Sequence, residues 1–235
     1  MNQHHIRSLM LFALTGLWSA SAQAEWVGNI NFTSNYVYNG VTQTKDKAAA
    51  QAGLDYYHAM GFYAGAWASN VHFRGSPARV EADFYLGWAG GISDKADIDF
   101  NMAYFRYFGD SVLSYPQANL RFNYNWSEHF SSWLLIEYSP RYFGVREEDY
   151  GHARLGFTGT LPGTWSWTAE IGYSETDNPG LLVIDYNEDH VTDWRLAIGR
   201  EWLGWNGELF YTDTDVGEDN PDADAVVGVS VGRTL

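Results

Sequence analysis

Charged side chains recur at every second position along several segments of the chain, with apolar residues between them. Glu81 and Asp83, for example, alternate with Ala82 and Phe84. In an extended strand this spacing gathers the charges on one face and the apolar groups on the other. Charges of both signs on one face can pair with each other, or they can line an aqueous path and select ions by sign. The candidate lining residues are Asp55, Arg79, Glu81, Asp83, Asp97, Asp99, Arg121, Glu137, Arg154, Glu170, Arg195 and Glu208.

A second group of polar residues has the composition of a hydrolytic site. It comprises Asp185, Glu188, Asp189, His190 and Asp193. A histidine beside carboxylates supplies a base and a group that orients it. However, no nucleophile motif accompanies this group, and a single histidine in an acidic stretch is most often simply solvated. We therefore predict no enzyme and no catalytic residue, and we keep a surface hydrolase using His190 as the weakest alternative.

The stretch from Asp213 to Asp224 is rich in carboxylates at close spacing. Carboxylate oxygens are the ligands that calcium prefers, but the spacing here differs from that of an EF-hand loop. A solvated acidic loop, bridged by cations to lipopolysaccharide, is the favoured interpretation. We predict no metal site and no cofactor.

These residues must be positioned by strands, because the alternation has a period of two and no helical period competes with it. Runs of about ten alternating residues, separated by turn residues, are typical of membrane β-barrels. The predicted fold is an all-β, transmembrane, antiparallel up-and-down barrel of about twelve strands. The strands are expected near residues 26–38, 48–57, 62–70, 79–89, 97–107, 117–126, 131–139, 151–161, 165–174, 191–201, 205–213 and 224–235.

The connections between these strands alternate between short and long, as expected of a barrel with short periplasmic turns and long outer loops. Aromatic residues also fall near predicted strand ends, which suits two girdles at the lipid interfaces. The expected outer girdle is Tyr38, Tyr104, Tyr138, Tyr173 and Tyr211, and the expected periplasmic girdle is Trp26, Tyr56, Trp88, Trp126, Trp165 and Trp205. One segment, 131–138, fits poorly because Trp133 and Leu135 fall on its polar face; a bulge or an inward plug would explain it.

The first residues indicate export. Arg7 precedes an apolar run, Leu9–Leu17, that is too short to span a bilayer and is followed by Ala22-Gln23-Ala24. We predict a signal peptide over 1–24 and a single barrel domain over 25–235. The absence of cysteine leaves stability to the sheet, and a net charge of −15 argues against nucleic acid as a partner.

Three motifs resemble a known family. They are Ser34-Asn35-Tyr36-Val37-Tyr38-Asn39-Gly40-Val41-Thr42-Gln43-Thr44, Gln51-Ala52-Gly53-Leu54-Asp55-Tyr56 and Gly61-Phe62-Tyr63-Ala64-Gly65-Ala66-Trp67-Ala68-Ser69-Asn70-Val71. They are similar to those of the TorF-type porin family (Gcw_chp) of proteobacterial outer-membrane proteins. The chain departs from the family at Asn39, where arginine is usual, at Ala48, where proline is common, and at Leu235, where an aromatic residue usually ends the chain. The resemblance implies passage of small solutes and supplies no established catalytic or binding residue.

Together these observations predict a porin-like channel in the outer membrane of a Gram-negative bacterium. It would pass small hydrophilic solutes or ions by passive diffusion, with weak cation selectivity because the candidate lining residues are net acidic. Its other expected partners are outer-membrane lipid and lipopolysaccharide. The main alternative is a plugged barrel with a structural or adhesive role.

Overall fold

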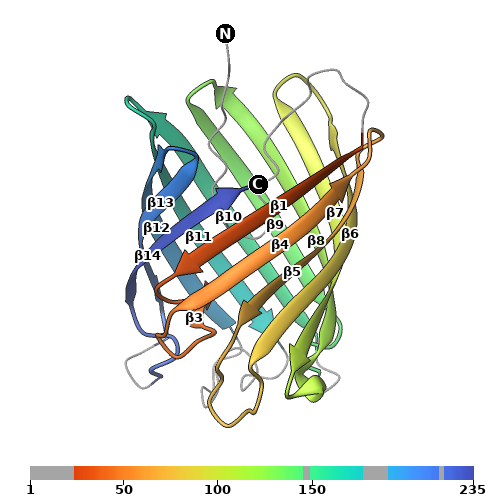
Figure 1. Cartoon of the computed structure of the whole chain (residues 1–235), viewed down its shortest axis with the longest axis vertical. Coiled ribbons are helices and arrows are strands. Elements are labelled where there is room, and N and C mark those ends of the chain that lie inside the picture. Colours follow the sequence, from red (N-terminus) through yellow and green to blue (C-terminus); the bar gives the residue numbers. More distant parts are fainter. Residues whose placement is uncertain (1–23, 145–148, 177–189, 217–219) are drawn as a thin grey trace.

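The computed structural model describes residues 24–144, 149–176, 190–216 and 220–235. The described residues form a closed barrel of twelve antiparallel strands, each paired with its neighbours along the chain (Figure 1). The strands are β1 (Glu25–Thr33), β4 (Ala49–Tyr57), β5 (Phe62–Asn70), β6 (Val80–Gly91), β7 (Ala96–Phe108), β8 (Tyr115–Ser127), β9 (Phe130–Ser139), β10 (Tyr150–Leu161), β11 (Trp165–Thr176), β12 (His190–Trp202), β13 (Trp205–Thr214) and β14 (Val226–Thr234). Pairing of β1 with β14 closes the sheet. The predicted barrel is confirmed.

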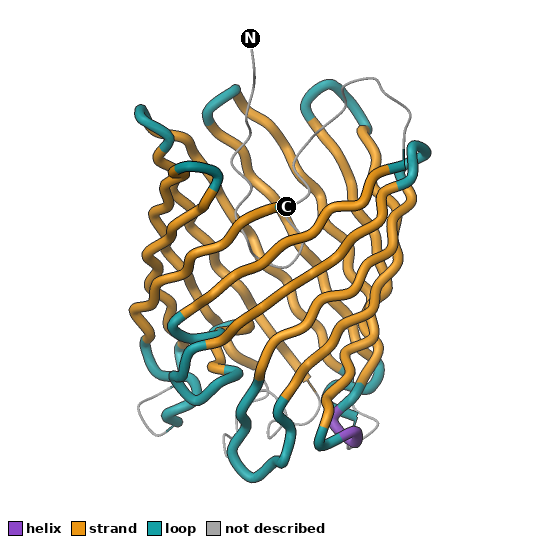
Figure 2. The backbone as a smooth tube through the Cα atoms, in the orientation of Figure 1, coloured by secondary structure: helices purple, strands orange, loops and turns teal. Residues whose placement is uncertain are grey.

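The two ends of the barrel differ. At the short-turn end the strands are joined by residues 58–61, 92–95, 128–129, 162–164 and 203–204. The connections at the opposite, long-loop end are longer, as Figure 2 shows at the bottom of the view. They include a short 3₁₀ helix, η1 (Ser111–Leu113), and a small hairpin of β2 (Val37–Tyr38) and β3 (Val41–Thr42).

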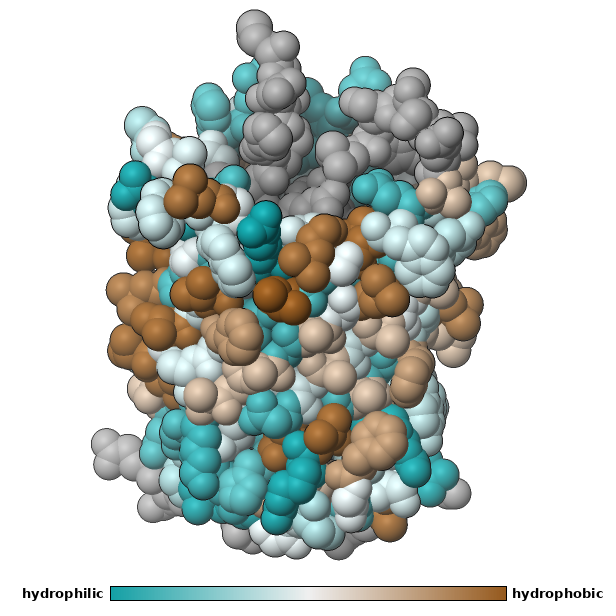
Figure 3. Space-filling model, viewed as in Figure 1, coloured by the Kyte–Doolittle hydropathy of each residue, from teal (hydrophilic) through white to brown (hydrophobic). Residues whose placement is uncertain are grey.

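Alternation divides each strand between two environments. On β6, the outward side chains Phe84 and Leu86 are 53% and 65% exposed, whereas Glu81 and Asp83 point inward and are 2% and 1% exposed. The outer surface therefore carries an apolar band, which Figure 3 shows across the middle of one face. Such a band suits contact with lipid. In the described part of the chain, no helix is long and apolar enough to cross a membrane.

Most aromatic residues of the two predicted girdles face outward near the strand ends, and Tyr38 does not. Tyr104, Tyr138, Tyr173 and Tyr211 are outward-facing near the long-loop end, between 36% and 47% exposed. Trp26, Trp88, Trp126 and Trp165 are exposed near the short turns. Tyr38 is the exception: β1 ends at Thr33, not near residue 38, and the chain then turns into the barrel and carries Tyr38 with it.

The segment 131–138 needs no bulge. Trp133 and Leu135 both point into the barrel, while Leu134 and Ile136 face outward. Trp133 lies opposite Gly156 on β10, where an added Cβ would sit 2.6 Å from the indole Nε1, so a glycine is required there. The register irregularity falls instead between Asn125 and Ser127. The predicted signal peptide lies outside the described residues, apart from Ala24.

Candidate functional site: the barrel interior

The interior of the barrel holds a cavity of about 320 Å³. It extends from residues near the short-turn end, such as Tyr57, Asn125 and Thr234, to the tip of the first long loop at Asn39 and Gly40. Polar side chains line it because the inward positions of nearly every strand are polar or aromatic. The lining residues thus reach the short-turn end of the barrel.

Ion pairs occupy the wall formed by β8 to β13. Arg154 on β10 donates to Asp193 at 2.7 Å and to Glu170 at 3.3 Å. Arg195 on β12 pairs with Glu208 on β13. These guanidinium groups are largely buried, so pairing compensates part of their lost hydration.

Arg121 lies beside this network. The register places Arg121, Leu135 and Arg154 side by side on three neighbouring strands. The Arg121 guanidinium stacks over the Trp133 ring at 4.1 Å and donates through Nε to Asn123 at 2.8 Å. An inward tryptophan thus serves as a platform for a cation.

The opposite wall has less charge. Inward side chains of β1, β4 and β5 are mainly amides and aromatics, among them Asn29, Asn31, Gln51 and Tyr63. Asp55 is the charged lining residue on these strands, and it accepts a hydrogen bond from Tyr85. The cavity therefore has one strongly charged wall and one mainly neutral wall.

The first loop, residues 34–48, folds into the barrel and ends the cavity. At its tip, Asn39 donates to Glu137 at 3.2 Å and to the Tyr150 hydroxyl at 2.8 Å, and accepts from Arg154 at 3.0 Å. Gly40 follows with φ of +80°, and a Cβ there would lie 2.8 Å from the Cβ of Asp193. Only glycine fits this turn without displacing the loop.

Aromatic side chains fill the interior beyond the first loop, towards the long-loop end. Phe105 stacks on Tyr115 at 4.7 Å between ring centroids, and Tyr142, from the β9–β10 loop, stacks on Tyr150 at 3.9 Å. Phe143 of the same loop contacts both Tyr107 and Tyr115. Burial, followed by the charges of neighbouring groups, raises the pKa of the Tyr142 hydroxyl well above its ordinary value, so it stays neutral. We call this group, with Tyr36 and Tyr38, the aromatic plug.

The predicted lining residues fall into three groups. Those at the cavity surface are Asp55, Arg121, Glu137, Arg154, Glu170, Arg195 and Glu208. Glu81, Asp83, Asp97 and Asp99 point inward but do not line the cavity. Three of these four carboxylates accept hydrogen bonds within the barrel: Glu81 from Tyr107 at 3.1 Å, Asp97 from Asn123 at 2.6 Å and Asp99 from Tyr63 at 2.5 Å.

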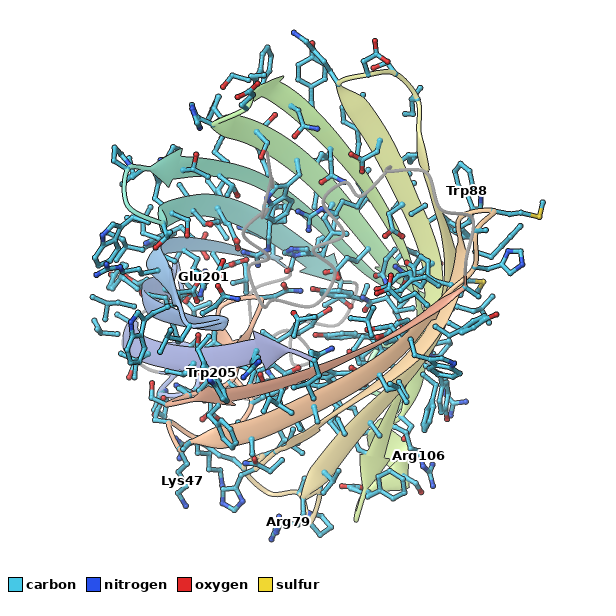
Figure 4. All side chains as sticks on the ribbon, turned by 45° about the horizontal axis from the view of Figure 1, so that its top comes forward. Lys47, Arg79, Trp88, Arg106, Glu201 and Trp205 are labelled. Carbon is cyan, nitrogen blue, oxygen red and sulfur yellow. The ribbon has the colours of Figure 1, made fainter. Side chains whose placement is uncertain are left out.

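Arg79 is placed differently from the expectation. It precedes β6, is exposed, and donates to the carbonyl of Ala78 at 2.7 Å. Figure 4 shows it on the outside of the barrel at the long-loop end. Alternation alone put it on the inward face, but the strand begins one residue later.

Sequence reasoning missed two parts of the site. The acidic stretch suggests an outer loop for Asp193, yet this residue lies on β12 two residues before Arg195 and faces inward with it. Because Asp193 and Arg195 are two residues apart on one strand, they share a face, and that spacing could have revealed the inward position of Asp193. Nothing in the spacing of the first loop indicated that Asn39 would enter the barrel.

The hydrolytic alternative is not assembled by the residues that can be placed. His190 faces outward and stacks on Tyr173, on the opposite face of β12 from Asp193. Asp185, Glu188 and Asp189 lie outside the described residues. Within the described ranges, no group of three or more His, Cys, Asp or Glu side chains is placed to hold a metal ion.

One protein-family model matches this sequence. The family model described as "Bacterial protein of unknown function (Gcw_chp)" matches residues 19–229. The chain belongs to the Gcw_chp family. In this Gcw_chp protein the first loop carries the motif on which the family resemblance chiefly rested. No curated protein matches it in sequence.

Solved structures share the fold of this Gcw_chp protein. The KdgM porin matches with a TM-score of 0.58 and 8% identity, covering 89% of this chain and 98% of the porin. The NanC porin gives the same TM-score, identity and coverage. An outer-membrane channel from Pseudomonas putida matches with a TM-score of 0.50 and 11% identity, covering 92% and 97% of the two chains. At such identities the likeness establishes the barrel fold and no residue roles.

Proposed function

We propose that this Gcw_chp protein is a porin-like channel of the outer membrane that passes small hydrophilic solutes or ions. The observation that carries the proposal is the polar cavity, which reaches from the short-turn end to the first loop inside a closed barrel. The apolar outer band and the two aromatic girdles suit a barrel embedded in lipid, with lipopolysaccharide around its outer half. The porin fold of its structural neighbours supports the same conclusion.

Passage through this barrel requires the first loop to move. Asn39 ends the cavity, and the aromatic plug, to which Tyr38 belongs, fills the space beyond it. The first loop, with Tyr36 and Tyr38, and the β9–β10 loop, with Tyr142 and Phe143, can be displaced without breaking the strand ladder, whereas the other plug residues lie on β7, β8 and β10. We therefore propose a channel that opens when the first loop leaves its position against Glu137 and Arg154.

The cavity charges favour cations. Asp55, Glu137, Glu170, Asp193 and Glu208 line it against the three arginines Arg121, Arg154 and Arg195. A surplus of carboxylates in a confined space raises the local concentration of cations. The KdgM porin has been described in complex with disordered oligogalacturonate, a polyanion. The surplus of carboxylates in the present cavity favours neutral or cationic solutes instead.

Reversal potentials in planar bilayers under a salt gradient test this proposal. The expected sign is cationic, and Asp55→Asn is expected to reduce the preference because it removes a charge from the cavity. Asp213→Asn is the matched control, since Asp213 lies on the outward face of β13 and accepts from Tyr211. An anionic reversal potential in the parent protein would refute the selectivity.

A closed structural barrel is the second candidate, and the aromatic plug is the observation that favours it. Under this alternative, neither the parent protein nor a variant with a loosened first loop would conduct. Conductance of either protein would exclude it, and silence of both would exclude the channel.

A further inference from the structure

A strip of basic residues lies on the outside of the barrel at the long-loop end of β4 to β7. Lys47 and Lys45 belong to the first loop, Arg79 precedes β6, and Arg106 lies on β7. Figure 4 shows Lys47, Arg79 and Arg106 projecting outward from the same side of the barrel. We call Lys45, Lys47, Arg79 and Arg106 the basic strip. It stands out in a chain with 14 lysines and arginines against 29 acidic residues.

Backbone hydrogen bonds join the segments that carry these residues. His72 donates its amide to the Gln43 carbonyl at 2.8 Å, which joins the end of β5 to the first loop. The amide of Val71 donates to the carbonyl of Arg79 at 3.0 Å. The amide of Arg79 donates to the carbonyl of Phe108 at 3.0 Å, and Phe108 lies two residues after Arg106. Partial desolvation and the charges of Lys45, Lys47 and Arg79 lower the pKa of His72, which places this imidazole in their common field.

Acidic neighbours neutralise the basic strip only in part. In the same loops, Asp46 accepts from Asn35 at 2.7 Å and Asp110 accepts from Ser76 at 2.8 Å. Among the residues that the structure describes, no ion pair joins the basic strip to a carboxylate. Its positive charge is thus available to an external anion.

The surface directly below the basic strip is shallow. The register aligns Ala52, Ala68 and Ala82 across β4, β5 and β6, and continues this row to Arg106 on β7. Phe32 on β1 and Phe84 on β6 stand beside the alanines and are 56% and 53% exposed. The three alanines therefore form a row of small side chains on the outward face that spans about 10 Å across β4, β5 and β6 at the usual strand spacing. We call this row the alanine furrow.

The height of the furrow fits a lipid headgroup. Tyr104, in the outer aromatic girdle, pairs with Phe84 and lies two residues below Arg106 on the same outward face. Arg106 therefore sits just beyond the level at which aromatic side chains mark the membrane interface. Cations placed there meet headgroup phosphates, while apolar groups below them meet acyl chains.

We propose that the basic strip and the alanine furrow form a binding site for lipid A, the phosphorylated anchor of lipopolysaccharide. This inference rests on the proposed placement in the outer membrane. Lys47, Arg79 and Arg106 hold the phosphates, and an acyl chain lies over Ala52, Ala68 and Ala82. The basic strip together with the alanine furrow favours a lipid that carries both anionic phosphates and acyl chains.

The test measures binding of lipid A to the detergent-solubilised, folded full chain by native mass spectrometry. The variant Lys47→Gln/Arg79→Gln/Arg106→Gln is expected to bind at least about tenfold more weakly, because each cation near an anionic headgroup contributes severalfold to affinity. The matched control is Lys95→Gln/Arg200→Gln/Arg233→Gln, which removes the same charge at the short-turn end. There, Arg200 and Arg233 lie over Trp165 and Trp205.

A second pair of variants tests the furrow. Ala52→Phe fills it and is expected to weaken binding of lipid A, whereas Ala153→Phe, on the exposed outward face of β10, is not. Lipid A stripped of its phosphates should bind the parent protein and the Gln variant equally weakly. Equal affinities of the two triple variants for intact lipid A would overturn the proposal. Inorganic phosphate that displaced lipid A at equal concentration would also overturn it, since the site would then bind a soluble anion.

Folding and conductance keep the two proposals separate. Each variant is first checked for the different mobility of unboiled and boiled samples, which reports the closed barrel. A protein that conducts ions but shows no preference for lipid A refutes this inference alone. If the parent protein binds lipid A and neither it nor the variant with a loosened first loop conducts, the channel alone is refuted.

Discussion

Replacing Asn39 by alanine isolates the contribution of the first loop to closure. The change removes both hydrogen bonds donated by Asn39, to Glu137 and Tyr150, and the one it accepts from Arg154. The charges of the barrel wall are unchanged. Because Asn39 has a φ of +46°, alanine also strains the loop backbone, which favours displacement of the loop as well. The variant therefore weakens the inward position of the loop without altering the cavity lining otherwise.

The magnitude follows from these three contacts. A hydrogen bond contributes about 0.5–1.5 kcal/mol net, so the three give about 1.5–4.5 kcal/mol. Glu137 keeps Gln117 as a donor at 3.1 Å, and Arg154 keeps Asp193, so the lower half of this range applies. A loss of about 2 kcal/mol shifts the equilibrium between the inward and displaced loop by roughly 30-fold.

Single-channel recording measures this shift as open probability. Asn39→Ala is expected to open far more often than the parent protein at unchanged cation preference. Asn101→Ala is the control, because Asn101 accepts a hydrogen bond from Asn119 at 2.7 Å inside the barrel, between β7 and β8 and away from the first loop. Identical open probabilities for Asn39→Ala and the parent protein would show that the loop tip does not hold the channel closed.

Three further predictions concern the barrel itself. Unboiled protein should migrate differently from boiled protein in SDS gels, since a closed sheet offers no free edge; equal mobility would contradict the barrel. Phe84→Arg should reduce the folded fraction far more than Tyr85→Arg, because Phe84 faces lipid, where arginine costs about 2–4 kcal/mol, and Tyr85 faces inward beside Asp55. Gly156→Leu should destabilise the barrel by about 1–3 kcal/mol in urea unfolding, because the new side chain collides with Trp133. Trp133→Ala should restore most of that loss, and an additive double variant would disprove the contact.

Alternation of side chains was sufficient to predict the strands. A strand that faces lipid on one side and water or polar groups on the other needs a period of two, and β6 keeps it from Val80 to Trp88 without a break. The same rule placed Asp55, Arg121 and Glu170 at the cavity. Parity within a strand is a local property, so it is readable without knowledge of the rest of the fold.

The first loop could not be predicted in this way. Tyr36 and Tyr38 continue the outward parity of Phe32, and alternation therefore extended the strand to residue 38. The chain instead turns after Thr33, whose hydroxyl donates to the Asn35 carbonyl at 2.8 Å. The partners that draw the loop inward, Glu137 and Arg154, are about a hundred residues away in the sequence. Contacts between residues so far apart in the sequence produce no periodic pattern in it.

The closing pair of strands, β1 and β14, bears on the order in which the sheet forms. The β1–β14 ladder joins Asn29–Thr33 to Ser230–Thr234, and single bonds from Leu235 to Gly28 and from Ser34 to Val229 extend it. It links residues separated by nearly the whole chain, whereas every other ladder joins neighbouring strands. Its closure carries the largest entropy cost and must follow synthesis of the last strand. We therefore expect this seam to form last and, because its ladder is shorter than the neighbouring β1–β4 ladder, to be the place where unfolding begins.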